Sequence, residues 1–534
     1  KKSVLIARFG LAIVCACCFM TSLDRSIVNV ALPIMTNTLH VPFSQITWVV
    51  DGYLLMYAGL AIPAGRLADI LGQRRVFVAG LVLFTLASAV CGFSTNALLL
   101  IGARLLQGTG GACITAPSLV LLTSVVPTER RGAALGLCAS MIALAGVVGP
   151  VAGGFIISTL GTGWIFFINV PIGLLLVAAT LVVLPQMKIE KPHHFDSVGV
   201  ILATLGLSSI IFAVVEGPTY NWGTIVGPLN IMYFLVGGLL LLVIFAFWER
   251  TQSEPFLPLS FFKNWPFTCM VTINVLLSFA SLGVVFVMTL YLESAVGMSA
   301  LLAGLTLIPQ ALAVLIVSPL AGRVYDKVGS TPVLVGGLLC FALGTGLLAW
   351  VSNTDSNWLT LLLPLVLAGS GLACAISPVL GEALRSVKRP MMGTASGVIS
   401  TTRLVGGAIG VAVTYSFLQS HLVSVFNSQV ASAVQQAPAG QRQAFVAYLH
   451  ALMQSITVTH TPLSLSLQHI AQQIYAESFV TALRPTLIMT VCLLLIAVLL
   501  ALSVPVVATW KKDSQPSTSS GEAARNPQPA QSAS

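Results

Sequence analysis

The sequence predicts an all-α integral membrane protein, in which fourteen transmembrane helices form two six-helix bundles with two further helices inserted between them. Three observations lead to this fold class. The chain is 56% hydrophobic and only 8% charged, with a mean hydropathy of +0.96, whereas about 25% of the residues in a soluble domain are charged. Apolar windows of about 20 residues, each long enough to cross a bilayer, recur along the chain. Motifs of the first half also return in the second half.

Helices, and not barrel strands, are the expected spanning elements. Backbone polar groups in lipid must be satisfied within the protein, and these runs are too long and too uniformly apolar for barrel strands. The first run exceeds the roughly 7–15 apolar residues of a cleavable signal peptide, so we expect it to be a span. The predicted spans are 9–33, 46–64, 76–94, 97–122, 134–158, 163–184, 198–216, 227–248, 267–291, 299–320, 333–351, 357–381, 393–417 and 483–509.

The basic residues predict the orientation of the chain. Twenty of the 25 Lys and Arg residues lie at the termini or in alternate loops. The positive-inside rule places these loops and both termini in the cytoplasm, and an even number of spans requires the termini to share one side. The net charge of +9 is therefore explained by the basic residues of the cytoplasmic loops and termini and does not indicate nucleic-acid binding. We predict a multi-pass protein of the cytoplasmic (inner) membrane.

The chain repeats itself. The segment GRLADILGQRR at 65–75 returns as GRVYDKVGSTP at 322–332, an offset of 257 residues. Near-equal offsets in separate motifs indicate a duplicated unit of about six helices, and two parallel halves with a site between them are typical of transporters. A second set has an offset of 261 residues, matching Pro117, Gly132 and Gly136 with Pro378, Gly393 and Gly397.

This duplication divides the chain into predicted domains. Residues 1–190 form the N-terminal six-helix bundle, 191–262 the two inserted helices with their linkers, and 263–512 the C-terminal six-helix bundle. We expect residues 513–534, which are rich in Ser, Gln and Pro, to be a disordered cytoplasmic tail.

The C-terminal half contains a long predicted external loop at 418–482. Its middle, RQAFVAYLHALMQSI, has helical apolar spacing and predicts an amphipathic cap lying on the membrane surface. Its four histidines lack metal-ligand spacing and are expected to be solvated. The ten cysteines lie within apolar runs, where they are expected to be small buried residues and neither disulfides nor a zinc site.

Four charged residues fall at one depth in the outer half of the predicted membrane core. Asp24 lies about 24 Å from the inner face of a core about 30 Å thick, and Arg25 is next to it. Arg104 lies roughly 10 Å and Asp51 about 8 Å below the outer face. A charge at the centre of a membrane helix costs about 2.5–3.5 kcal/mol on insertion scales, so residues of this kind usually pair and mark a substrate or proton path.

Each of these positions has two interpretations. Asp24 and Arg104 could form a buried pair that only fixes helix packing. We favour proton coupling, in which Asp24 takes up a proton and releases it when Arg104 approaches. Asp51 could face water and bind a cationic substrate, or it could cap its helix near the interface.

Three more charged residues are candidates for substrate binding or coupling. Glu216 and Glu293 lie at the outer ends of the seventh and ninth predicted spans, where an exposed rim carboxylate is the favoured interpretation. Arg403 lies near mid-membrane in the thirteenth span, and the sequence does not identify its partner.

The repeated motif predicts a latch on the cytoplasmic side. Asp69, with Arg66, lies in an expected cytoplasmic turn, where a carboxylate can accept hydrogen bonds from the N-terminus of a neighbouring helix and hold the inner face closed. The repeat gives Arg323 and Asp326 the same place in the second half.

The fifth span carries AGVVGPVAGG at 145–154. Small residues at this spacing allow a tight helix contact, and Pro150 removes a backbone donor and permits a kink. The glycines expected on one face are Gly146, Gly149, Gly153 and Gly154.

Together these motifs resemble the major facilitator superfamily, and within it the fourteen-helix drug:proton antiporters that include quaternary-ammonium exporters. The resemblance covers residues 8–510. LDRSIVNVALP (23–33) is similar to that group's helix 1 motif and IGARLLQGTGGA (101–112) to its helix 4 motif, which implicates Asp24 and Arg104 in coupling. AGVVGPVAGG resembles the exporter motif but has Ala145 where glycine is usual. The positions in register with the loop 2–3 signature are Gly65, Asp69, Gly72, Arg74 and Arg75.

The segment WVVDGYLLMYAG at 48–59 favours cationic substrates, because the quaternary-ammonium exporters are similar in having an acid at the place of Asp51. Tyr53 in the same segment is a further candidate contact. The resemblance implies a monomer that exports lipophilic, cationic small molecules in exchange for protons by alternating access. It implies no cofactor, because the proton gradient drives the cycle.

Two alternatives stay open at this point. The first is proton-coupled export of an endogenous metabolite, peptide or lipid precursor. The second, an integral-membrane enzyme, is disfavoured because no nucleophile–base or metal-ligand constellation falls at one depth. An ATP-driven pump is disfavoured because the chain contains no GxxxxGK[ST] segment.

Overall fold

The computed structural model describes residues 2–186, 196–217, 220, 222–252, 255–257, 259–436, 441–453 and 465–504. Within these residues, 14 helices are long and apolar enough to cross a membrane, which confirms the predicted number. The elements are α1 (Lys2–Leu39), α2 (Phe43–Ile46), α3 (Trp48–Leu71), α4 (Gln73–Phe93), α5 (Ala97–Val125), η1 (Thr128–Arg130), α6 (Arg131–Leu160), α7 (Trp164–Phe167), α8 (Asn169–Val183), α9 (Ser197–Glu216), β1 (Thr224–Val226), β2 (Leu229–Asn230), α10 (Ile231–Thr251), η2 (Leu259–Lys263), α11 (Trp265–Ser294), α12 (Ala300–Val328), α13 (Ser330–Val351), α14 (Trp358–Arg385), η3 (Arg389–Met391), α15 (Met392–Gln436), α16 (Arg442–Met453) and α17 (Leu465–Ser503).

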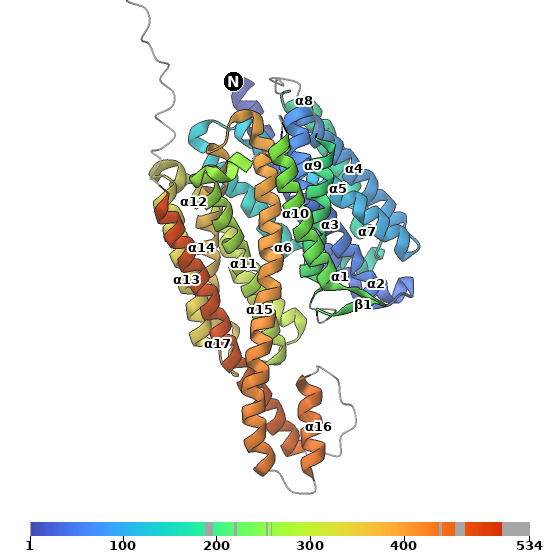
Figure 1. Cartoon of the computed structure of the whole chain (residues 1–534), viewed down its shortest axis with the longest axis vertical. Coiled ribbons are helices and arrows are strands. Elements are labelled where there is room, and N and C mark those ends of the chain that lie inside the picture. The colour runs from blue at the N-terminus through green and yellow to red at the C-terminus, as the bar shows by residue number, and fades with distance from the viewer. Residues whose placement is uncertain are drawn as a thin grey trace, which may run out of the picture.

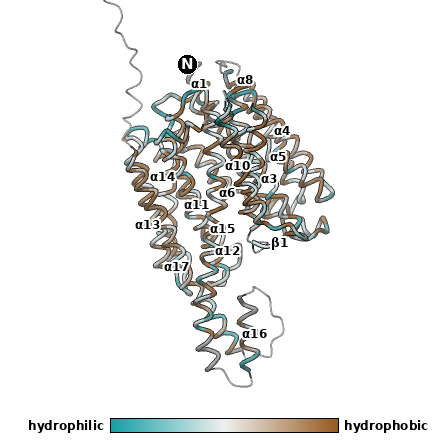
Figure 2. The backbone as a smooth tube through the Cα atoms, viewed as in Figure 1, coloured by the Kyte–Doolittle hydropathy of each residue, from teal (hydrophilic) through white to brown (hydrophobic). Residues whose placement is uncertain are grey.

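The helices stand side by side along the long axis of the molecule (Figure 1). We call the end at which α1 begins the inner end and the opposite end the outer end. Figure 2 shows apolar residues along most of the length of the helices. Large apolar side chains also face outward, for example Val182, which is 86% exposed, and Trp350, which is 83% exposed. An outward surface of this kind suits lipid and not water.

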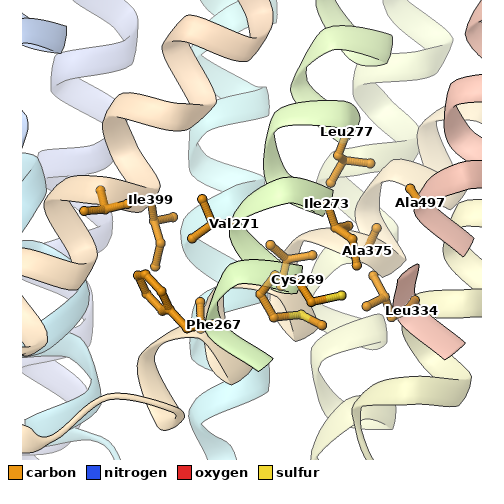
Figure 3. Close-up of a cluster of buried hydrophobic side chains, with 14 of the residues drawn as sticks. Phe267, Cys269, Val271, Ile273, Leu277, Leu334, Ala375, Ile399 and Ala497 are labelled. Carbon is orange, nitrogen blue, oxygen red and sulfur yellow. The ribbon is translucent and has the colours of Figure 1, made fainter. Parts of the chain in front are cut away.

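Each half has its own core. In the C-terminal half, α11, α13, α14, α15 and α17 contribute to one buried apolar cluster, whose members include Phe267, Ile273, Leu334 and Ile399 (Figure 3). In the N-terminal half, Phe77 and Phe84 of α4 pack among buried residues of α1, α3, α5 and α6. The bounds of the predicted domains remain predictions, and both 187–195 and the tail 513–534 lie outside the described residues.

The inserted helices α9 and α10 pack against each other, and α9 also packs on both α3 and α15, one helix from each half. The ring of Phe212 in α9 stacks on Trp48 of α3 with 5.6 Å between ring centroids, and it meets Phe234 of α10 at 4.8 Å. The antiparallel pair β1–β2 lies between α9 and α10 in the chain. The inserted pair therefore covers the α3–α15 junction, whereas α9 and α10 make no comparable contact with α6 or α12 in the described residues.

The prediction for 418–482 is wrong in two respects. In its described residues the segment is helical and not a loop, because α15 runs on to Gln436, α17 already begins at Leu465, and the helix predicted in its middle is found as α16. Nor does its middle lie on a membrane surface: α16 packs against α15 and α17 in a projection beyond the outer end (Figure 1). The apolar face of α16 is used in this contact, since Phe445 and Leu449 are buried against Phe426 of α15.

Candidate functional site

The structure brings Asp24 of α1 and Arg104 of α5 into direct contact. Arg104 Nη1 lies 2.6 Å from Asp24 Oδ2, and both side chains are 0% exposed. The expected ion pair is therefore present, and it is the only one described in the structure with both partners wholly buried. Removing one partner of a buried pair is costly, about 3–5 kcal/mol, because a charge is left without compensation.

Two further side chains hold the Asp24 carboxylate. Gln107 Nε2 of α5 donates to Asp24 Oδ1 at 2.8 Å, and Asn169 Nδ2 of α8 donates to the same oxygen at 2.9 Å. Both amides also donate to Ser88 Oγ of α4 at 3.2 Å, and Ser88 donates to the Phe166 carbonyl. We call Asp24, Ser88, Arg104, Gln107 and Asn169 the buried polar cluster.

Sequence reasoning missed both amides. Gln107 follows Arg104 by three residues, a spacing that places both side chains on one face of α5. Asn169 is a polar residue within an otherwise apolar span, and such residues in membrane helices often serve as hydrogen-bonding groups between helices. These two signals were available, but neither reveals which partner the amide meets.

Arg104 is held from several sides. Its Nε donates to the Val49 carbonyl of α3 at 2.8 Å, and its Nη1 also donates to Gln107 Oε1 at 2.7 Å. The guanidinium lies 4.3 Å from the centroid of the Tyr53 ring, a cation–π contact. Tyr53, a predicted substrate contact, is therefore buried under Arg104, and its hydroxyl has no hydrogen-bond partner among the described residues.

This arrangement makes the charge of Asp24 decisive for the packing of four helices. An ionised carboxylate accepts from all three donors, whereas a protonated one loses its ionic attraction for Arg104 and gains a donor. α1, α4, α5 and α8 all contribute to the buried polar cluster, so these four helices meet at Asp24.

Asp51 and Glu216 form a second carboxyl site. The Glu216 side chain lies close enough to Asp51 to act on it electrostatically and is only 6% exposed, so its interpretation as an exposed rim carboxylate is wrong. The contact arises because α9 docks on α3, which a sequence reading could not foresee. Two neighbouring carboxylates repel each other when both are ionised.

Two arginines stand apart from these carboxylates. Arg25 donates from Nη2 to Ser22 Oγ at 3.2 Å and lies 5.4 Å from the Tyr57 ring centroid. Both Arg25 and Arg403 of α15 are close enough to Cys18 to act on it electrostatically, so the two halves each bring a guanidinium to this region. Neither arginine forms an ion pair in the described part of the chain. Glu293 is half-buried in the last turn of α11.

A cavity of about 390 Å³ opens between the outer part of α9, Trp222 and α15. Its wall is mostly apolar and aromatic, a composition typical of small-molecule sites. The lining residues are Val214, Trp222, Ile409, Ala412, Val413, Ser416, Phe417 and Ser420.

The repeated motif joins the two halves at the inner end. Asp69 accepts hydrogen bonds from the backbone amides of Gly393 and Thr394, both at 2.8 Å, and from the Thr394 hydroxyl at 2.8 Å. These donors lie at the N-terminus of α15. Asp69 itself lies in the last turn of α3 and not in a turn between helices, because α3 continues to Leu71, seven residues beyond the predicted span.

The second copy of the motif makes the equivalent contact with the two halves exchanged. Asp326 of α12 accepts from the amides of Gly132 at 2.8 Å and Ala133 at 3.0 Å, at the N-terminus of α6. The two sets of repeated residues are therefore partners: the repeated aspartate of each half accepts a hydrogen bond from the repeated glycine of the other half. Both α3 and α12 end at a glycine with φ of +100°, Gly72 and Gly329, where other residues are strained.

The halves approach too closely there for larger residues. A Cβ on Gly65 would collide with the Gly393 carbonyl, and one on Gly322 with the Gly132 carbonyl. The arginines of the motif have other roles. Arg66 is buried beside Asp69, and Arg74 donates to the Leu181 carbonyl, whereas Arg75 and Arg323 are exposed.

The glycine-rich segment of α6 packs on α1, but only in part as expected. Gly149 faces Ser26, and Gly153 faces Ile27, with no room for a Cβ at either glycine. Gly146 and Gly154 face open space instead, although the Gly146 carbonyl accepts from Ser26 Oγ at 3.4 Å. Pro150 lies within a helix that is continuous from Arg131 to Leu160.

Comparisons with known proteins agree with this architecture. Residues 14–411 match the sequence profile of the Major Facilitator Superfamily. The chain is 31% identical over 417 residues to the multidrug resistance protein Stp of Mycobacterium tuberculosis, covering 78% of this chain and 76% of that protein. It is 30% identical to the tetracenomycin C resistance and export protein of Streptomyces glaucescens, again with 78% and 76% coverage.

Solved structures show the same fold at low sequence identity. The human organic anion transporter MFSD10 superposes with a TM-score of 0.58 at 13% identity, over 93% of this chain and 99% of that one. The proton:xylose symporter XylE superposes with a TM-score of 0.55 at 14% identity, over 89% and 94%.

Proposed function

The chain belongs to the Major Facilitator Superfamily, and from this premise we propose that it is a proton-coupled antiporter that exports lipophilic, cationic compounds by alternating access. It is a multi-pass membrane transporter and not an enzyme. Its relatives include drug- and antibiotic-resistance and export proteins, which supports a drug exporter. The proposal includes the inner membrane, a cytoplasmic inner end with both termini, a monomer, and no cofactor.

The observation that carries proton coupling is the buried polar cluster. Ionisable residues within membrane spans pair with one another and mark proton relays, and here proton uptake by Asp24 would remove the counter-charge of Arg104. Release of Arg104 on protonation, and its return on deprotonation, supplies two states that a proton gradient can bias.

Alternating access has support from the inner end. There the two latches, Asp69 on α15 and Asp326 on α6, hold the halves together through backbone amides. This state is closed at the inner end, and opening it requires both carboxylates to leave their helix N-termini.

Transport into proteoliposomes tests the proposal. With a pH gradient imposed, the purified chain is expected to accumulate a fluorescent lipophilic cation such as ethidium on the acid side, against its own gradient. An ionophore that exchanges K⁺ for H⁺ is expected to abolish this accumulation. Flux that persists unchanged after the gradient has collapsed would contradict proton coupling, and no movement of any cation tested would contradict the substrate class.

Asp51 is expected to contribute cation selectivity. We expect Asp51→Asn to weaken apparent affinity for dicationic compounds about tenfold, or about 1.4 kcal/mol, and affinity for neutral compounds less than about twofold. Asparagine has nearly the same size as aspartate but cannot ionise, so loss of charge is the main change. Competition binding with matched dicationic and neutral compounds measures the effect.

The matched control is Asp355→Asn, an exposed carboxylate in the connection between α13 and α14, which is expected to change neither affinity. Equal weakening of dicationic and neutral compounds by Asp51→Asn would show that Asp51 supports the structure of the site without selecting charge.

Acidic compounds are a second candidate substrate class. Arg25 and Arg403 lack ion-pair partners in the described residues, whereas the Asp24 carboxyl is already paired with Arg104. An anionic dye in the same transport assay distinguishes the classes, because Arg403→Gln would weaken its transport and spare that of cations.

A further inference from the structure

A small cavity between the two halves at the inner end has no role in the transport site described above. Its volume is about 140 Å³, well above the roughly 15 Å³ that admits one water. It lies where α6, α12 and α14 pack against one another. Residues of α5 and α6 form one wall, and residues of α12, α14 and η3 form the other.

Three of the ten described residues that line this cavity are arginines, and none is acidic. Arg131 comes from the N-terminal half, and Arg385 and Arg389 come from the C-terminal half. Arg131 and Arg389 are close enough to repel each other. The closed inner end thus brings like charges from opposite halves together. Glu129 attracts Arg131 and Glu382 lies near Arg385, so the repulsion is partly offset, and an anion bound between Arg131 and the exposed Arg389 would offset it further.

The carboxylates around the cavity are already engaged. Glu382 accepts from the Tyr325 hydroxyl at 3.2 Å and lies 3.8 Å from Arg385. Asp326 accepts from two backbone amides of α6. Glu129 is exposed and accepts from the Thr128 hydroxyl. None of these three carboxylates lines the cavity.

Guanidinium groups bind phosphate oxygens through paired, charge-assisted hydrogen bonds, and clusters of arginine are typical of phosphate recognition. The cavity also lies at the ends of membrane helices, at the depth where anionic lipid headgroups occur. Both the charge and the place of the cavity therefore fit a phosphate group.

We propose that this cavity binds a phosphate group and that the bound group holds the two halves together at the inner end. Opening of the inner end would move Arg131 away from Arg385 and Arg389 and dismantle the site. The ligand therefore favours the state closed at the inner end, because it binds the open state less well. The phosphate belongs either to an anionic phospholipid or to a free phosphate ion, and the role in gating rests on the proposed alternating access.

Binding to the purified full-length chain, without any pH gradient, tests the site. Isothermal titration in a zwitterionic detergent is carried out with two probes, dioctanoyl phosphatidylglycerol and inorganic phosphate. Saturable binding of the lipid alone identifies a headgroup site, and saturable binding of inorganic phosphate identifies a site for the free ion. Binding of neither probe would overturn the proposal.

Variants place the ligand in this cavity. Arg389→Gln and Arg131→Gln are each expected to weaken binding tenfold or more, and Arg389→Lys is expected to recover part of the loss. The matched controls are Arg130→Gln and Lys388→Gln, which remove neighbouring positive charges that do not line the cavity. Equal weakening by the controls would show diffuse attraction to a basic surface and would overturn the proposal.

Hydrogen exchange at the latch amides tests the gating role. Saturating ligand is expected to slow exchange of the Gly132 and Ala133 amides at least fivefold in the wild-type chain and to have no effect in Arg389→Gln. Unchanged exchange with ligand bound would remove the gating role. Proton-driven transport is measured separately, so a failure of proton coupling leaves the result for this cavity intact.

Discussion

Asp24→Asn is expected to abolish export driven by a pH gradient, lowering the gradient-dependent rate by about 10²-fold or more. Asparagine has nearly the same shape as aspartate and can keep the hydrogen bonds to Gln107 or Asn169, but it cannot take up or release a proton. It also leaves Arg104 without a counter-charge, at a cost of about 3–5 kcal/mol, which corresponds to about 10²–10⁴ in an equilibrium constant. Rates in proteoliposomes with and without the gradient measure the effect.

The control separates coupling from folding. Asp24→Asn combined with Arg104→Gln removes both charges, so it is expected to restore stability, measured by thermal unfolding, but not the response to the pH gradient. Ser88→Ala removes a hydroxyl of the same cluster that carries no charge, and it is expected to keep the response. Wild-type gradient-driven flux in Asp24→Asn would remove this carboxylate from the coupling mechanism.

Asp69→Ala is expected to slow transport with little change in substrate affinity. The change removes three hydrogen bonds from the α15 N-terminus to a carboxylate, and bonds to charged groups contribute about 1.5–3 kcal/mol each. Even a net loss of about 3 kcal/mol would shift the balance away from the state closed at the inner end by about 10²-fold. Hydrogen exchange of the Gly393 and Thr394 amides, together with transport kinetics, measures this shift.

Two comparisons support the assignment. Asp326→Ala is expected to have a similar effect on the Gly132 and Ala133 amides, because the second latch has the same geometry. Arg75→Ala, at an exposed position of the same motif, is expected to leave exchange and transport unchanged. A large loss of substrate affinity in Asp69→Ala would place this residue in the binding site.

Depth in the membrane could be predicted from the sequence. Hydropathy placed all 14 spans close to the helices found, because the bilayer selects apolar runs of fixed length. Counting residues from the ends of these spans put Asp24 and Arg104 at one level, and a buried charge at that level needs a partner. The internal repeat likewise singled out both latch carboxylates, Asp69 and Asp326, and the two glycines Gly393 and Gly132 that they contact.

What the sequence could not give is the direction in which each helix faces. The buried position of Glu216 against Asp51 follows from the docking of α9 on α3, and the membrane constrains the length of a helix but not its neighbours. Because the sequence does not show which helices are neighbours, it also could not place Asn169 in the buried polar cluster or identify a partner for Arg403.

The sequence by itself thus determined that this chain is a fourteen-span transporter with a buried ion pair in its first half. The reason is that the bilayer fixes, along the membrane normal, how long and how apolar a span must be and on which side basic residues lie. Only the tertiary structure decided which faces meet: that α16 packs in a projection and not on lipid, and that Arg131 joins Arg385 and Arg389 around one cavity. These contacts depend on side-chain packing between segments far apart in the chain, for which hydropathy carries no signal.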